Sequence, residues 1–368
     1  MLFHLILQPF NDRIAINCQH SALFKDQAFA LLTFENIDVK KSYWKVSYST
    51  LDIQYMTIKN SIWEENIVEI DDLSELPQVW IDIQYSTQRR SVFTLAAKPS
   101  IFISHSLLEK ITFNSLRNSN ISISCSQVID SNFGNSKDLH EVWDNVEFTI
   151  EDSSILNSNV TLARFRHVTF HNVSFHETNM LAIIYTYDVL FQNVIAREGR
   201  FYSLLQSNGN LNIWESVFDS LDSIENFKHL FDIISTSPID IDSSLFSNNK
   251  APVMHLLDIL AANIYYSNFL DNIGPCLAAE WNTFLVGSFI RIESVNFINN
   301  TCTDCEGSAA QLNFDSIEIV ESYFQGNQAL NGGALRINSA ESQISKSVFL
   351  DNIASYKEEL FIFLILLL

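Results

Sequence analysis

A phenylalanine followed three residues later by an asparagine recurs at a nearly constant interval in the second half of this chain, and no other feature constrains the fold as strongly. The asparagines of successive pairs stand 23, 28, 27 and 25 residues apart. A period of about 20–50 residues indicates stacked copies of one small structural unit. The chain is therefore expected to wind, so that residues one turn apart become vertical neighbours. The five pairs are Phe246/Asn249, Phe269/Asn272, Phe297/Asn300, Phe324/Asn327 and Phe349/Asn352.

Weaker copies of the repeat extend towards the N-terminus. Phe191, Phe218 and Phe246 stand 27 and 28 residues apart, which predicts that the phase persists from about residue 190 to the end. Before residue 100 the pattern becomes hard to follow. A serine also precedes each phenylalanine of the five pairs by two or three positions, namely Ser244, Ser267, Ser294, Ser322 and Ser347.

The segments between the repeated residues favour strands. Short β-rich runs broken by Asn, Ser or Asp dominate, and helical periodicity is hard to find. One turn of about 25 residues has room for three short strands, which would stack on the next turn at the ordinary inter-strand spacing. The sequence therefore predicts an all-β fold, a right-handed parallel β-helix of about ten coils with three short strands per coil. The alternative is a leucine-rich horseshoe, which expects L-x-x-L-x-L before the asparagine and a helical convex side.

The repeated residues have expected places in such a coil. One phenylalanine per coil is expected to stack on its neighbours inside, where an aromatic ring buries a large apolar area. An asparagine at a bend can donate its amide to the asparagine of the next coil and accept from that of the previous coil. Asparagine also tolerates the left-handed backbone of a sharp bend.

The chain shows no linker, so one elongated domain is the simplest organisation. We expect irregular coils or a cap over residues 1–100, β-helix repeats over 101–356 and an apolar tail over 357–368. The nine apolar residues of the run Leu360–Leu368 are too few to cross about 30 Å of hydrocarbon. Three interpretations of the run are left open: the first half of a truncated membrane span, the next strand of the stack, or a cap. Met1–Phe10 has no basic leader and no cleavage site, so the start is a poor signal peptide.

Charge and cysteine content exclude some classes of protein. The net charge of −21 repels phosphate backbones, so we expect no nucleic-acid partner. The cysteines are too few, and odd in number, for a disulfide scaffold. Cys302 and Cys305 form a C-x-x-C pair, interpreted as a local loop disulfide or two free thiols, with metal or redox use as the lesser alternative. The pairing state is left open for all five cysteines, Cys18, Cys125, Cys276, Cys302 and Cys305.

The segment FQGNQALNGGAL, Phe324 to Leu335, resembles the F-x-x-N and G-G-A-[ILV] repeats of polymorphic outer membrane proteins. A second, degenerate copy of the glycine half stands at Gly307–Ala309. The wider pattern is similar to the pectin-lyase-like right-handed β-helix superfamily and to large surface repeat proteins of some protists. The resemblance implies a surface-displayed β-helical passenger.

The residue sets of catalytic β-helices are not found together in this sequence. The galacturonase-like N-x-D, D-D, G-H-G and R-x-K elements are absent as a set, and Asp71–Asp72 is an adjacent pair without partners. The run VWIDI, Val79–Ile83, looks like a pectate-lyase segment, but Ile83 replaces its histidine, which favours a buried strand. His167, His171 and His176 are interpreted as outward-facing polar residues of strands. We therefore predict no catalytic residue, no metal site and no cofactor.

The function expected from these observations is that of a non-catalytic cell-surface or adhesion-type repeat protein. It would be the extracellular part of a membrane-anchored protein, with a segment near or beyond the C-terminus as anchor and an unknown protein or glycan as ligand. The alternative is a polysaccharide lyase or glycoside hydrolase on the same fold. The oligomeric state is left open. Four N-x-[ST] sequons are candidate glycosylation sites, at Asn120, Asn159, Asn172 and Asn299.

Overall fold

The computed structural model describes residues 3–4, 29–36, 38–40, 43–46, 52–70, 79–95, 99–114, 120–133, 147–163, 167–184, 188–207, 209–224, 228–235, 238–280 and 287–355. These residues form strands and turns and contain no helix. The chain is an all-β parallel β-solenoid, as predicted, and the horseshoe alternative is wrong because its helical side is missing from the described part. The chain divides into two compact units, Met1–Val168 and Thr169–Leu368.

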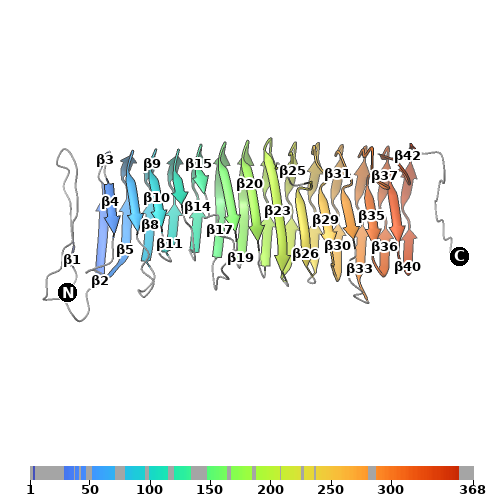
Figure 1. Ribbon diagram of the computed structural model, residues 1–368, viewed down its shortest axis with the longest axis horizontal. Coiled ribbons are helices and arrows are strands. Elements are labelled where there is room, and N and C mark those ends of the chain that lie inside the picture. Colours follow the sequence, from blue (N-terminus) through green and yellow to red (C-terminus); the bar gives the residue numbers. More distant parts are fainter. Residues whose placement is uncertain are drawn as a thin grey trace. The chain divides into compact units, whose positions relative to one another are not determined.

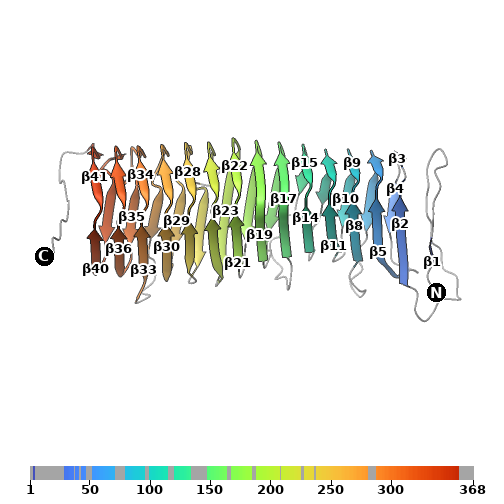
Figure 2. The same cartoon turned by 180° about the vertical axis from the view of Figure 1, so that it is seen from behind.

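Each complete coil of the second unit contributes three strands, and each strand pairs in parallel with the strand at the same place in the next coil (Figures 1 and 2). The unit boundary falls within β19 (His167–His176), which runs on through the first corner of its coil. The first strands that follow are β21 (Asp188–Gln192), β24 (Asn210–Trp214), β27 (Ile239–Asp242), β30 (Ala261–Tyr265), β33 (Phe289–Glu293), β36 (Ser316–Val320) and β40 (Glu341–Ser345). The second strands are β22 (Ile195–Arg197), β25 (Val217–Asp219), β28 (Leu245–Ser247), β31 (Asn268–Leu270), β34 (Asn296–Ile298), β37 (Tyr323–Gln325) and β41 (Val348–Leu350). The third strands are β20 (Asn179–Ile184), β23 (Arg200–Ser207), β26 (Phe231–Ser235), β29 (Met254–Leu257), β32 (Leu277–Glu280), β35 (Ala310–Asn313) and β39 (Leu335–Asn338). A short extra pair joins β38 (Gln328–Ala329) to β42 (Ile353–Ala354).

The first unit follows the same three-strand order. Short β1 (Phe3–His4) pairs with β2. The first strands are β2 (Phe29–Glu35), β5 (Asp52–Lys59), β8 (Val79–Gln84), β11 (Pro99–Ser104), β14 (Asn120–Ser124) and the longer β17 (Glu147–Leu156). The second strands are β3 (Asp38–Lys40), β6 (Ile62–Glu64), β9 (Thr87–Arg89), β12 (Leu107–Glu109) and β15 (Gln127–Ile129). The third strands are β4 (Tyr43–Val46), β7 (Ile67–Ile70), β10 (Val92–Leu95), β13 (Thr112–Asn114), β16 (Asn132–Phe133) and β18 (Asn159–Ala163). Regular coils therefore begin well before residue 100.

The strands from Pro99 to Ala354 make about ten turns, in agreement with the sequence-based expectation. The predicted boundaries at residues 100 and 356 remain predictions. The apolar tail over 357–368 lies outside the described residues, as does most of Met1–Phe10. Within the described part, no helix is long and apolar enough to span a bilayer.

The corners between strands depend on single residues in the left-handed backbone region. Tyr266 (φ 47°) and Asp271 (φ 54°) make the two corners of one coil, and the buried residue after each, Ser267 and Asn272, turns its side chain towards a neighbouring coil. Because a left-handed residue redirects the chain within one position, strands of three to five residues can follow one another directly.

The repeated serines do not all occupy the same position of the coil: Ser294 occupies the left-handed corner itself (φ 57°), and Val295 fills the buried position after it. One sequence-based phase assignment differs from the structure. Phe191 does not continue the Phe218–Phe246 row. It lies in a first strand opposite Ile213, while Ala196 is the residue in register with Phe218. A spacing that matches the period does not fix which of the three strands a phenylalanine belongs to.

Candidate functional site

The five repeated phenylalanines form one continuous row inside the second unit. Adjacent rings from Phe246 to Phe349 are stacked, with centroids 4.6–5.0 Å apart and planes within 11° of parallel. Phe246, Phe269, Phe297 and Phe324 are fully buried, whereas Phe349 in the last described coil is 44% exposed. The row therefore contributes apolar burial to the solenoid and presents no side chain to a ligand, except at its C-terminal end.

The repeated asparagines form a second row, at the corner after the phenylalanines. In the first four, the amide Nδ2 donates to the Oδ1 of the next asparagine, at 2.8 Å from Asn249, 3.0 Å from Asn272, 3.0 Å from Asn300 and 2.9 Å from Asn327. The same nitrogen also donates to a phenylalanine carbonyl of the preceding coil, as from Asn300 to Phe269 at 2.9 Å. Both Nδ2 hydrogens of these four residues are thus used within the fold.

The last pair of the repeat differs from the expectation for an internal ladder. Asn352 is only half-buried, whereas Asn249, Asn272, Asn300 and Asn327 are fully buried. Asn352 accepts from Asn327 and donates to the Phe324 carbonyl at 2.9 Å, but the expected donation to an asparagine of the next coil is missing from the described residues. The physical reason is position: Asn352, like Phe349, lies in the last described coil, and no described coil covers it. Asn352 therefore takes part in the asparagine row as its half-buried member in the last described coil.

The outward residues named in the sequence analysis are dispersed. His167 and His171 are half-buried and His176 is exposed, in the alternating outward positions of β19, which confirms that they face outwards. VWIDI lies in β8, where Ile81 and Ile83 are buried, as expected for an ordinary strand. Asp71–Asp72 lies outside the described residues.

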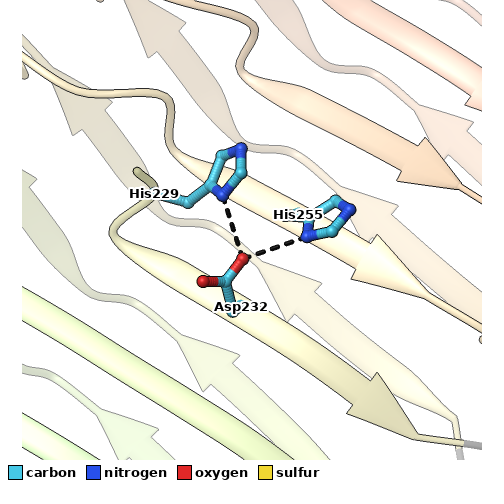
Figure 3. Close-up of side chains that lie close together, drawn as sticks. All are labelled: His229, Asp232 and His255. Atoms are coloured by element: carbon cyan, nitrogen blue, oxygen red, sulfur yellow. Dashed lines mark hydrogen bonds and ion pairs between the residues drawn. The ribbon is translucent and has the colours of Figure 1, made fainter. Parts of the chain in front are cut away.

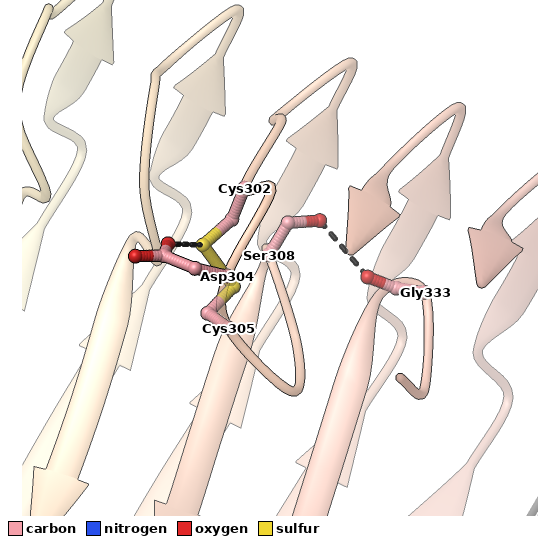
Figure 4. Close-up of a disulfide and its surroundings, with 5 residues drawn as sticks. All are labelled: Cys302, Asp304, Cys305, Ser308 and Gly333. Atoms are coloured by element: carbon pink, nitrogen blue, oxygen red, sulfur yellow. Dashed lines mark hydrogen bonds between the residues drawn. A yellow bond between two sulfur atoms is a disulfide. The ribbon is translucent and has the colours of Figure 1, made fainter. Parts of the chain in front are cut away.

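The cysteines divide into one pair and single thiols. Figure 4 shows that Cys302 and Cys305 form a disulfide, with their Cα atoms 5.6 Å apart, in the loop that precedes Ser308. Cys125 is a free exposed thiol and Cys276 is free and buried. Cys18 is outside the described residues. Of the interpretations left open for the C-x-x-C pair, the structure has the local loop disulfide.

A shallow charged groove of about 360 Å³ lies on the first unit. Its walls are Glu64, Arg89, Arg90, Glu109 and Lys110. Both glutamates pair with arginines, Glu109 with Arg89 at 3.1 Å and Glu64 with Arg90 in a shorter contact. A glycosidase or lyase groove needs carboxylates available as acid and base. The ion-paired glutamates of this groove do not supply that arrangement.

A cluster of two histidines and one aspartate stands out on the third-strand face of the second unit (Figure 3). Asp232 in β26 is in register with His255 in β29, one coil later. His229 precedes Asp232 by three residues. Both histidine Nδ1 atoms contact the same carboxylate oxygen, Asp232 Oδ1, at 2.9 Å from His229 and 3.0 Å from His255. The two imidazole rings are stacked, with centroids 4.8 Å apart.

The environment of this cluster keeps Asp232 ionised. Burial raises the pKa of the Asp232 carboxyl, but hydrogen bonds from His229, His255 and Tyr202 outweigh burial and hold that pKa far below its usual range. Burial and the negative charge of Asp232 raise the pKa of the Tyr202 phenol well above its usual range, so this hydroxyl stays protonated and donates to Asp232. The site therefore carries a fixed carboxylate held by three donors.

This environment predicts a pH-dependent contribution to stability. Because the folded-state pKa of Asp232 lies below the unfolded value of about 3.9, its contribution is present above about pH 4 and is lost as the pH falls further. In urea titrations, wild type is expected to be more stable than Asp232→Asn at neutral pH, with a difference that shrinks below about pH 4. Tyr202→Phe, which removes one donor and keeps both histidines, should show a smaller loss. Parallel decline of wild type and Asp232→Asn in acid would contradict this assignment.

The three residues of this cluster were not among those predicted from the sequence, although a signal for two of them was present. Asp232 and His255 are 23 residues apart, the same separation as Asn249 and Asn272. That spacing places two polar residues at the same strand position of adjacent coils. The contribution of His229 could not be predicted in this way, because His229 lies before β26 and has no counterpart at the same spacing in an adjacent coil.

Comparisons with known proteins show no family for this chain. No family model and no curated protein sequence matches the chain. Among solved structures, the chain is similar to HetL, a pentapeptide repeat protein involved in heterocyst differentiation regulation from the cyanobacterium Nostoc sp. strain PCC 7120. The identity is 9%, with 86% of this chain and 87% of HetL covered, and the TM-score is 0.18. So low a score carries no functional inference. The polymorphic outer membrane protein resemblance is not confirmed, and the chain is identified as a β-solenoid repeat protein.

Proposed function

We propose that this chain is a non-catalytic repeat protein of a cell-surface or extracellular setting, whose outward faces bind a protein or glycan. One observation carries the proposal: the inward positions of the second strands repeat, whereas the outward positions differ from coil to coil. The residues in register directly after Phe218 and the five repeated phenylalanines are Asp219, Ser247, Leu270, Ile298, Gln325 and Leu350, and all of them except the buried Ser247 are half-buried or exposed. Such a division lets the interior stabilise the stack while the exterior varies to suit a ligand.

The location of the native product tests this proposal. Surface biotinylation of intact cells, followed by detection of the full-length product, is expected to label the protein, with a cytosolic enzyme as the negative control. A secreted product recovered from the medium would also support it. A product found in the cytosol alone would overturn the proposed setting.

The sequons add an independent prediction, because the structure differs in how accessible their asparagines are. Asn159, Asn172 and Asn299 are exposed, whereas Asn120 is half-buried and accepts a hydrogen bond from the Glu147 amide at 3.0 Å. After passage through a eukaryotic secretory pathway, we expect glycans at exposed sequons and little or none at Asn120. Replacing Asn159, Asn172 and Asn299 singly by Gln should each remove one glycosidase-sensitive step on a gel, whereas Asn120→Gln should change nothing. Glycan at Asn120 alone would contradict the prediction.

A further inference from the structure

The spacing of three ligand-type atoms in the histidine–aspartate cluster suits a metal ion. Zinc–nitrogen and zinc–oxygen bonds are about 2.1 Å long and protein zinc sites are mostly tetrahedral, so ligand atoms lie roughly 3.4 Å apart. His229 Nδ1 and His255 Nδ1 lie 2.9 Å and 3.0 Å from Asp232 Oδ1, and one ligand atom from each residue lies within 4.8 Å of the others. Small shifts of the two rings would bring all three atoms onto one face of a coordination sphere.

The fold holds these ligands before any ion arrives. Asp232 and His255 are fixed by strand pairing between β26 and β29. His229 is followed by Leu230 and Phe231, whose amides donate to Pro252 and Val253 at 2.9 Å each. Tyr202, which is 3% exposed, donates its hydroxyl to the Asp232 carboxylate. Such outer hydrogen bonds orient metal ligands and raise affinity.

The site is also reachable and has suitable charge. The side chains of His229, Asp232 and His255 are 18%, 18% and 20% exposed, so solvent has access to a largely protected site. Histidines bind metals as neutral imidazoles, so this ligand set with its carboxylate would carry a single negative charge when an ion is bound, which favours a divalent cation. Imidazole ligands favour Zn²⁺, Ni²⁺, Cu²⁺ or Fe²⁺ over Mg²⁺ and Ca²⁺, which prefer oxygen.

We propose that His229, Asp232 and His255 bind one divalent first-row transition-metal ion through Nδ1, Oδ1 and Nδ1. Solvent would supply the remaining ligands. On binding, each ring proton would reside on Nε2, because the Nδ1 lone pair must face the ion. The ion would connect the corner that precedes β26 to the following coil.

A second group of ligand-type residues provides the comparison. His176, Glu177 and Glu198 also lie close together, but all three are exposed and His176 Nε2 is 3.6 Å from Glu198. Exposed acidic groups gather in this way without a ligand, and no buried donor fixes the carboxylates among the described residues. We therefore use this group as the matched control.

The test is metal titration of the full chain, without a polyhistidine tag and after removal of metals by a chelator. Isothermal titration with Zn²⁺ and visible absorption with Co²⁺ are expected to show one site per chain, unaffected by millimolar Mg²⁺. His229→Ala and His255→Ala should each weaken binding at least 100-fold, and Tyr202→Phe about 10-fold. His176→Ala and Cys125→Ser should bind as wild type.

NMR of the wild-type chain makes the test independent of whether a variant folds. With Zn²⁺, only two of the nine histidines should show the Nδ1 shift of a metal-bound nitrogen. Circular dichroism in metal-free buffer establishes that each variant is folded before its affinity is compared. Absence of saturable binding, binding retained by a His229→Ala/His255→Ala double variant, or shifts at other histidines would overturn the proposal.

Discussion

Replacing Asn300 by alanine is expected to lower the free energy of unfolding by about 2–6 kcal/mol. The side chain of Asn300 is fully buried and takes part in four hydrogen bonds. Its Oδ1 accepts from the backbone amide and the side-chain amide of Asn272, and its Nδ2 donates to Asn327 and to the carbonyl of Phe269. Truncation leaves buried backbone groups without these partners, at about 1–3 kcal/mol each.

Urea unfolding followed by circular dichroism measures this loss. The matched control is Asn338→Ala, because Asn338 is exposed and makes one long bond to Asn313 at 3.3 Å. We expect the control to change stability by no more than about 0.5 kcal/mol. Similar stability for wild type and Asn300→Ala would show that the asparagine row does not stabilise the stack.

Replacing Phe297 by alanine is expected to cost about 3–5 kcal/mol. Its ring is fully buried between Phe269 and Phe324, with centroid distances of 4.9 Å and 5.0 Å. Removing it leaves a cavity between two rings held in place by strand pairing, so the site cannot collapse fully. Phe297→Leu keeps most of the volume and should recover most of the loss.

Phe349→Ala is the control for the phenylalanine row. Phe349 is 44% exposed and stacks on one ring only among the described residues, that of Phe324 at 4.6 Å. Its replacement removes less buried area, so we expect about 1–2 kcal/mol. Equal losses for the two variants, measured in the same urea titrations, would be inconsistent with an internal row that weakens towards the last described coil.

Part of the structure could be predicted from residue spacing because the repeat places the same residue type at the same position of successive coils. Phe269, Phe297 and Phe324 are one coil apart in sequence, and parallel pairing in register makes their rings adjacent. Phe191 shows where this reasoning failed. Corner residues and neighbouring strands differ by one to a few positions, so a period known to within a few residues cannot distinguish them.

The repeat also does not indicate how deeply neighbouring coils bury the side chains of each copy of the motif. Asn352 matches the motif as well as Asn327 does, yet Asn327 is fully buried and Asn352 is half-buried. Burial of a ladder residue depends on the coils on both sides of it, and a motif reports only the coil that contains it.

The candidate site was harder to predict than the core. Core positions recur, so each coil supports the interpretation of the next, whereas the histidine–aspartate cluster occurs once among the described residues and has no period. Its elements also depend on side-chain direction: Tyr202, in the coil before Asp232, reaches the carboxylate from a buried position. No sequence spacing indicates that a tyrosine hydroxyl will point at that oxygen.

A parallel β-helix could be predicted from the residues alone, because a regular interval between apolar and amide side chains can be satisfied when successive turns lie on one another. Which outward residues meet depends on the folded chain. That choice depends on the corners, where one left-handed residue more or less rotates the following strand, and on the position of His229 just before β26. His229, Asp232 and His255 come together for this local reason, which the repeat does not encode.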